Sequence, residues 1–156
     1  MRKIMIVDDN YLSAEGIEKN IDWEVLNAEI VHICYNGTSA IDAMKKEPVD
    51  LIISDIEMPD LDGISMSRQA LDINPMVKII LISAYDKFEY ARRALLLGAL
   101  DYIEKPLDYA YLIQKVKNAF ALMEKEQKNL PLLKQSRPLL TEKFFREITH
   151  LPSSEA

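Results

Sequence analysis

The stretch Asp50-Leu-Ile-Ile-Ser-Asp55 decides the fold, because a short apolar run ends there in an acidic residue. Three further runs rich in Ile and Val are Ile4–Val7, Ile30–Ile33 and Val77–Ile82. Their hydrophobicity is continuous rather than alternating, which is typical of strands covered on both faces of a parallel sheet. The pattern therefore predicts four strands of one parallel sheet.

Stretches with helical spacing of apolar residues lie between these runs. They are centred on residues 12–21, 40–44, 64–71 and 88–95. Asn36-Gly37-Thr38 is typical of a turn that leads into a helix, and Gly98 stands where a helix should end. A brief fifth strand, Tyr102–Ile103, precedes a long helix predicted from about Leu107 to Glu126. Five strand–helix units in succession predict an α/β fold with right-handed crossovers.

Polar residues stand at the carboxyl ends of four predicted strands, where such sheets bind their ligands. They are Asp8 and Asp9 after the first strand, Asp55 after the third, Ser83 after the fourth and Lys105 after the fifth. Each residue alone is more commonly part of a solvated turn or a helix cap. Together they predict that three carboxylates, a hydroxyl and an ammonium group converge on one edge of the sheet.

Such a group of side chains suits phosphoryl transfer. Clustered carboxylates repel one another and call for a divalent cation, and Mg²⁺ accepts a few carboxylates together with phosphate oxygens. Asp55 can act as a nucleophile that forms a mixed anhydride with phosphate. Lys105 and the Ser83 hydroxyl can each contact a phosphate oxygen. The edge therefore predicts a Mg²⁺-assisted phosphoryl-accepting site.

Five motifs closely resemble, in order and spacing, the receiver domain of bacterial two-component response regulators. They are Ile4-Met-Ile-Val-Asp-Asp9, Asp50-Leu-Ile-Ile-Ser-Asp55, Met58-Pro-Asp-Leu-Asp-Gly63, Ile80-Leu-Ile-Ser-Ala84 and Asp101-Tyr-Ile-Glu-Lys-Pro106. The resemblance covers roughly residues 1–125. It implies a flavodoxin-like (βα)5 doubly wound parallel sheet with strand order 2-1-3-4-5.

The resemblance also implies a role for each residue at this edge. Asp55 matches the phosphoacceptor, and Asp9 matches the direct Mg²⁺ ligand, with Asp8 acting through water. The backbone carbonyl of Glu57 matches the third protein ligand of the metal. Lys105 matches the phosphate-binding lysine, and its bond to Pro106 is expected to be cis.

Ser83 and Tyr102 match the switch pair of the family. The resemblance implies that the hydroxyl turns towards the phosphoryl group while the aromatic ring moves inward, and that the fourth helix and fifth strand rearrange. The face formed by the fourth helix, fifth strand and fifth helix would then control homodimerisation. Oppositely charged residues could pair across a two-fold axis there; they are Lys87, Arg92 and Arg93 on one side and Asp101, Glu104 and Asp108 on the other.

Two further segments resemble receivers of the AraC/YesN type. They are Ile21-Asp-Trp-Glu24 and Ser83-Ala-Tyr-Asp-Lys-Phe-Glu-Tyr-Ala91. Regulators of this type join the receiver to a C-terminal helix-turn-helix DNA-binding domain, which is absent from this chain. Whatever the branch, Trp23 is expected to anchor the loop before the second strand.

Residues 126–156 are expected to form a helical linker or dimerisation segment. Pro131 and Pro138 should break the long helix. Beyond them Leu140, Phe144 and Ile148 recur every four residues, which predicts an amphipathic helix. That helix either packs back on the receiver or contributes to a dimer that leads to the effector domain.

Composition limits the remaining possibilities. The chain has 156 residues, 49% of them hydrophobic, and a formal net charge of −6, which gives this segment itself no reason to bind nucleic acid. No signal peptide and no membrane span are predicted, so a cytoplasmic location is expected. The single cysteine, Cys34, is expected to be a small buried hydrophobe.

The sequence thus predicts a phosphorylation-activated signalling switch, not an enzyme, that works with a sensor histidine kinase. One alternative is a stand-alone receiver that acts by protein contact. Another is an aspartyl-phosphate-forming enzyme on the same fold. The enzyme reading is opposed by Glu57, which stands where aspartyl phosphatases place an acidic aspartate, and by the lack of a glycine-rich phosphate loop.

Overall fold

The computed structural model describes residues 1–84 and 88–136, along which strands and helices alternate. The strands are β1 (Arg2–Val7), β2 (Ala28–Cys34), β3 (Leu51–Asp55), β4 (Lys78–Ser83) and β5 (Asp101–Glu104). The helices are α1 (Tyr11–Asn20), α2 (Gly37–Lys46), α3 (Gly63–Ile73), α4 (Phe88–Leu97) and α5 (Tyr109–Ser136). The predicted succession of five strand–helix units is confirmed. Most strands extend slightly beyond the apolar runs that predicted them.

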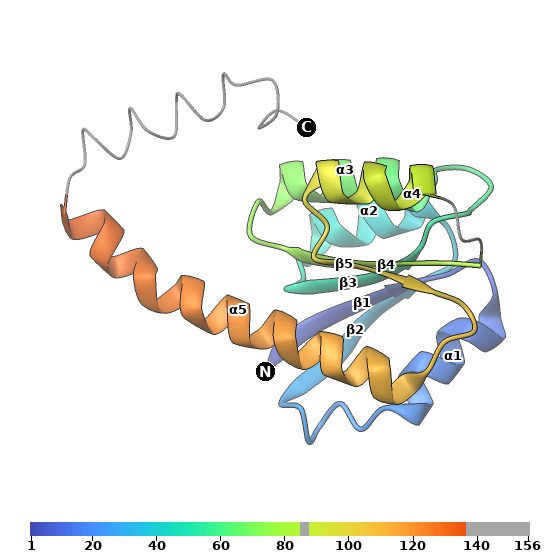
Figure 1. Cartoon of the computed structure of the whole chain (residues 1–156), viewed down its shortest axis with the longest axis horizontal. Coiled ribbons are helices and arrows are strands. Elements are labelled where there is room, and N and C mark those ends of the chain that lie inside the picture. The colour runs from blue at the N-terminus through green and yellow to red at the C-terminus, as the bar shows by residue number, and fades with distance from the viewer. Residues whose placement is uncertain (85–87, 137–156) are drawn as a thin grey trace.

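The strands form one sheet in the order β2-β1-β3-β4-β5, and every neighbouring pair is parallel. Helices α2, α3 and α4 cover one face of the sheet, whereas α1 and α5 cover the other (Figure 1). The predicted flavodoxin-like doubly wound fold is therefore confirmed. In this order the direction of winding reverses between β1 and β3, which is where such sheets bind their ligands.

Burial follows each strand's position in the sheet. All five residues of β3 are buried, and so are the last four of β1 and the last five of β4. In β2, by contrast, only Ala28 and Cys34 are buried, and Glu29 is exposed. The prediction that Ile30–Ile33 is covered on both faces is wrong, because β2 lies at the edge of the sheet, where the flanking helices cover less of its surface.

Short polar side chains fix the starts of three helices. The side chains of Asn10, Asn36 and Asp62 accept hydrogen bonds from the first free backbone N–H groups of α1, α2 and α3. The predicted start of α2 after Asn36 is confirmed. At the other end of a helix, Gly98 follows α4 with a φ of 96°, a left-handed conformation that favours glycine.

Trp23 and Cys34 both serve packing. Trp23 is buried in the cluster between the sheet and helices α1 and α5, and its indole N–H donates a 3.2 Å hydrogen bond to the carbonyl of Ile17. It therefore anchors the loop before β2 to α1, as predicted. Cys34 is buried on the opposite face of the sheet, with its Sγ 4.0 Å from the sulfur of Met5.

Helix α5 is longer than the sequence predicted. It begins at Tyr109 rather than near Leu107, and it continues through Pro131 to Ser136. The expectation that Pro131 ends the helix is wrong, since proline removes one hydrogen bond but has a φ near −65° that is itself helical. The helix extends well beyond the sheet (Figure 1). Pro138 and the predicted stripe Leu140, Phe144 and Ile148 lie outside the described residues.

One ion pair holds α5 to the sheet near the point where the helix leaves it. The Lys78 ammonium group at the start of β4 lies 2.7 Å from one carboxylate oxygen of Glu126 and 2.8 Å from the other. Both side chains are partly buried, so solvent screens the pair less than it would a fully exposed pair. The apolar contacts of Leu112, Val116 and Met123 complete the attachment of α5.

Two of the charged residues expected to pair between protomers have partners within the chain. Arg92 pairs with Glu89 on its own helix at 2.8 Å, and Asp101 pairs with Lys115 of α5 at 3.1 Å. Lys87 lies outside the described residues. Pairing across a two-fold axis would therefore have to displace or share these contacts, which the sequence did not indicate.

Among the described residues, no helix combines the length and the apolar character needed to cross a membrane.

Candidate functional site

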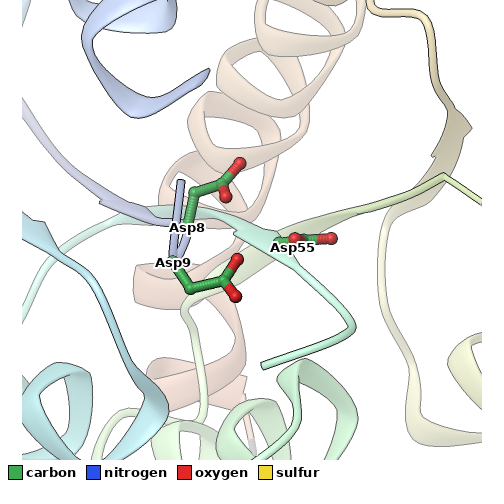
Figure 2. A group of neighbouring side chains, drawn as sticks. All are labelled: Asp8, Asp9 and Asp55. Carbon is green, nitrogen blue, oxygen red and sulfur yellow. The ribbon is translucent and has the colours of Figure 1, made fainter. Parts of the chain in front are cut away.

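The acidic residues predicted at the sheet edge lie together there. Asp8 and Asp9 directly follow β1, and Asp55 is the last residue of the neighbouring strand β3. In Figure 2 the Asp8 and Asp9 side chains both extend from the end of β1 towards the side on which Asp55 lies. One carboxylate oxygen from each residue lies within 4.8 Å of the others. Asp8 and Asp55 are buried, whereas Asp9 is exposed, so the cluster opens to solvent at Asp9.

The backbone around these carboxylates is held by hydrogen bonds. Asp8 Oδ1 accepts a 2.9 Å hydrogen bond from the backbone N–H of Asn10, the cap of α1. Beyond Asp55, the N–H of Ile56 donates to the carbonyl of Ile82, and the N–H of Gly63 donates back to the carbonyl of Ile56 at 2.7 Å. The segment 56–62 therefore leaves β3 and returns to its end, as a closed loop beside the acidic cluster.

Gly63 makes that return possible. A Cβ at this position would overlap the carbonyl oxygen of Asp55 and press on the backbone of Ile56. Only glycine lets the start of α3 approach the end of β3 so closely. The last glycine of the Met58–Gly63 motif thus has a steric role that is independent of any ligand.

Lys105 supplies the positive charge of the site. Its ammonium nitrogen lies 3.6 Å from Asp55 Oδ2 and 3.7 Å from Asp8 Oδ2. The backbone N–H of Lys105 donates a 2.8 Å hydrogen bond to the carbonyl of Ser83, which ties the end of β5 to the end of β4. The bond between Lys105 and Pro106 is cis, as the resemblance implies. One lysine therefore faces three carboxylates, which leaves the cluster net negative.

The switch pair predicted from the resemblance lies on the neighbouring strands. Ser83 is the last residue of β4 and is fully buried. Tyr102 is half-buried on the adjacent edge strand β5 and packs against the apolar cluster that α4 also contacts. Their proposed movement stays a prediction, but both residues lie where a change at Asp55 could reach α4.

Glu57 lies on the loop two residues after Asp55. One of its carboxylate oxygens, Oε1, is buried and has no hydrogen-bond partner among the described residues. Its predicted role, however, concerns the backbone carbonyl, and that role stays a prediction.

Burial and mutual repulsion weaken the acidity of the cluster. Burial raises the pKa of Asp55 from 3.8 to about 6; the charge of Lys105 acts against this rise, and the charges of Asp8 and Asp9 add to it. The pKa of Asp8 is also raised, chiefly by burial, although the hydrogen bond from Asn10 and the charge of Lys105 oppose the change. Full ionisation of these carboxylates is therefore energetically unfavourable when no cation is bound.

This arrangement fits Mg²⁺ by its donor chemistry. Three carboxylates with oxygens within 4.8 Å offer hard oxygen ligands. The raised pKa values of Asp8 and Asp55, caused chiefly by burial and also by neighbouring carboxylates, show that their charges lack compensation that a divalent cation would supply. The open side at Asp9 leaves room for water and phosphate oxygens to complete the coordination.

The raised pKa of Asp55 predicts a pH-dependent stability of the metal-free protein. Because the folded-state pKa is above the unfolded value, protonation stabilises the fold as pH falls through about 6, and this contribution is lost above it. Unfolding by urea in EDTA, at pH 5 and at pH 7.5, measures the effect. Asp55→Asn should stabilise the protein by about 1 kcal/mol more at pH 7.5 than at pH 5, because at pH 5 the unfolded carboxyl is already ionised and part of the effect is present there too. An equal gain at both pH values would contradict the prediction.

One residue of the loop beside the site, Asp60, makes a contact that no sequence pattern predicted. Asp60 accepts hydrogen bonds from the backbone N–H groups of Gly37 and Thr38, at 3.2 Å each, across the start of α2. The residues lie 22 and 23 positions apart in the chain, so no local pattern could have revealed the contact.

Comparison with known proteins agrees with this geometry. The response regulator receiver domain model matches residues 4–117. The chain is 28% identical over 126 residues to the uncharacterized transcriptional regulatory protein YesN of Bacillus subtilis, which covers 81% of this chain and 34% of YesN. Among solved structures, the REC domain of AraT, a response regulator from Geobacillus stearothermophilus, superimposes with a TM-score of 0.76 at 34% identity, covering 81% of this chain and 98% of that one.

A second solved structure of a response regulator also matches this chain. The two component transcriptional regulator AraC from Clostridium phytofermentans matches with a TM-score of 0.73 at 29% identity, over 83% of this chain and 99% of that one. By contrast, the chain spans less than half the length of the curated relatives it matches.

The family is one of signalling regulators rather than classical enzymes, and its receiver domains bind Mg²⁺ at an acidic pocket and work with histidine kinases. The fold, the order of the motifs and the acidic cluster all agree with it. The chain belongs to the response regulator receiver domain family, and it resembles the receivers of AraC-type transcriptional regulators.

Proposed function

We propose that this chain is a phosphorylation-activated receiver that accepts a phosphoryl group on Asp55 from a sensor histidine kinase. The single observation that carries the proposal is the juxtaposition of Asp55 with Asp8, Asp9 and Lys105 at the switch point of the sheet. A carboxylate nucleophile, a set of metal-binding oxygens and a compact cation within one small site meet the requirements of phosphoryl transfer.

Each residue has a part in the proposed reaction. A carboxylate oxygen of Asp55 attacks phosphorus and forms an acyl phosphate, while the bond from phosphorus to the leaving group breaks. Lys105, 3.6 Å from Asp55 Oδ2, offsets negative charge on the transferred group. The Ser83 hydroxyl donates to one of its oxygens.

Mg²⁺ would neutralise the negative charge that otherwise opposes the attack. It would be held by Asp9, by Asp55 and by the backbone carbonyl of Glu57, with Asp8 acting through water. The remaining residues shape access to the site. A cleft of about 470 Å³ adjoins Asp9 and is lined also by Glu57, Tyr90 and Arg93. It leaves a path for a phosphodonor to reach the acidic cluster.

The proposed output is a shift of the α4–β5–α5 face. In this proposal Ser83 turns towards the phosphoryl group and the half-buried Tyr102 ring moves further into the cluster behind it, which biases the position of α4. The new face favours a homodimer. Residues 1–125 act as the receiver in this proposal, and residues 126–156 act as the helical linker to a DNA-binding domain outside this chain. The greater length of the curated relatives supports this division.

Labelling by a small acyl phosphate tests the proposal. In the presence of Mg²⁺, the intact mass of the chain should rise by one phosphoryl group, and peptide mapping should place that group on Asp55. EDTA should suppress the reaction, because the carboxylate cluster then repels the incoming phosphate. The matched control is the same Mg²⁺ buffer without EDTA, at equal ionic strength. Labelling that is equally fast in EDTA, or a label on another residue, would contradict the proposal.

A further inference from the structure

We propose that Asp60 is a positioning residue for phosphoryl transfer: its carboxylate ties loop 56–62 to the start of α2 and so holds the Glu57 backbone beside Asp55. The inference rests on the proposed function and deepens it. Asp60 itself is exposed and lies outside the acidic cluster of Asp8, Asp9 and Asp55. Its effect on the reaction would therefore come through the loop.

Two side chains from different segments cap α2 together. Asn36 Oδ1 accepts from the N–H of Ser39 at 2.7 Å, whereas the two Asp60 oxygens accept from the N–H groups of Gly37 and Thr38 at 3.2 Å each. These N–H groups have no partner within the helix. A carboxylate is also favoured at the positive end of a helix dipole. Asp60 thus completes a cap that the local sequence of α2 leaves incomplete.

The backbone of the loop also lies directly against α2. A Cβ on Gly37 would overlap the carbonyl oxygen and the Cβ of Leu61, the residue after Asp60. This close approach is independent of the hydrogen bonds of Asp60. The contact between the loop and α2 therefore rests on steric fit as well as on charge.

The loop is held at its ends as well as at its middle. The N–H of Gly63 bonds to the carbonyl of Ile56, and Asp62 caps α3. Only Ile56–Pro59 separate Asp55 from Asp60, so fixing Asp60 leaves the intervening backbone little freedom. Glu57 lies in that short span, and the resemblance gives its carbonyl a role in holding the metal.

The charge of Asp60 persists at any pH used to study phosphorylation. A hydrogen bond from the Thr38 side chain, together with hydrogen bonds from backbone N–H groups, lowers the pKa of Asp60 to about 2, although burial acts in the opposite direction. The tie between the loop and α2 is therefore not expected to change with pH in that range.

The test compares Asp60→Ala with Asp42→Ala in the full chain. Asp42 is exposed on α2, the helix that Asp60 caps. Its replacement makes the same change in net charge without touching the loop. Residues that orient metal ligands typically contribute 10- to 100-fold to affinity or activity. We expect Asp60→Ala to weaken Mg²⁺ binding, measured by titration calorimetry, roughly tenfold, and to slow labelling by an acyl phosphate by a similar factor. Asp42→Ala should match the unchanged chain.

Raising Mg²⁺ separates positioning from general damage. Saturating Mg²⁺ should restore most of the labelling rate of Asp60→Ala if the defect lies in holding the metal ligands, and circular dichroism in EDTA should show that the variant is already folded before Mg²⁺ stabilises it. Thr38→Val should show a smaller loss in the same direction, and Thr38→Ser, which keeps the hydroxyl donor, should show none. The Thr38 pair also decides the question if Asp60→Ala does not fold.

Mg²⁺ affinity and labelling unchanged in folded Asp60→Ala would overturn the inference, as would equal losses in Asp60→Ala and Asp42→Ala. Failure of the unchanged chain to become labelled is a different result. It would refute the proposed phosphoryl transfer, while the comparison of Mg²⁺ affinities would still decide whether Asp60 positions the loop.

Discussion

Replacement of Asp55 by Asn is expected to abolish phosphoryl labelling of the chain. Asparagine has nearly the same shape as aspartate, so it can occupy this buried position, where 7% of the residue is exposed. Its amide, however, cannot act as the carboxylate nucleophile. The expected loss of labelling rate is on the order of 10³-fold or more, as when a nucleophile is removed from other covalent mechanisms. Intact-mass measurement after exposure to an acyl phosphate and Mg²⁺ gives the rate.

The control for this variant is Asp72→Asn, which changes the same charge on an exposed position of α3. It should be labelled at the rate of the unchanged chain. Circular dichroism should show that Asp55→Asn remains folded. If folded Asp55→Asn is labelled as fast as the control, the acceptor is another residue and the assignment of Asp55 is wrong.

Replacement of Asp9 by Asn should have the largest effect on Mg²⁺ binding. Asp9 is the exposed member of the acidic cluster, and its removal takes away one hard oxygen ligand and one negative charge. We expect Mg²⁺ affinity to fall roughly 10- to 100-fold, at least as much as when an outer-shell partner is lost. Calorimetric titration of the metal measures it. Labelling at limiting Mg²⁺ should fall in parallel.

Asp9→Asn should also change the pKa of Asp55 in the metal-free protein. The charge of Asp9 contributes to the raised pKa of Asp55, so Asp9→Asn should lower that pKa towards the ordinary value. An NMR titration of the Asp55 carboxyl in EDTA would detect the change. Asp42→Asn, on an exposed position of α2, is the control for both measurements. If Asp9→Asn leaves both the Mg²⁺ affinity and the Asp55 pKa unaltered, Asp9 does not belong to the site.

Much of this molecule could be predicted because its signals are local in the sequence. Runs such as Leu51–Ile53 are continuously apolar since both faces of a central strand are covered. The residue that follows each run must then lie at the carboxyl edge of the sheet. This is why Asp8, Asp9, Asp55 and Lys105 could be grouped before any distance was known.

Other features depend on which distant segments meet. The exposure of β2 follows from its place at the edge, and the pairing of Asp101 with Lys115 follows from how α5 lies against β5. The continuation of α5 beyond Pro131 was not predicted. A proline removes one helical hydrogen bond, which usually but not always ends a helix.

By itself, then, the sequence determined the order of elements, the parallel sheet and the group of residues at its edge, since periodicity and strand-end position are properties of neighbouring residues; the doubly wound strand order came from the resemblance to the family. Only the tertiary structure decided the 3.6 Å approach of Lys105 to Asp55, the burial that raises the pKa of Asp55 to about 6, and the attachment of Asp60 to α2. Distance, desolvation and capping between segments arise only when parts of the chain far apart in sequence are brought into contact by folding.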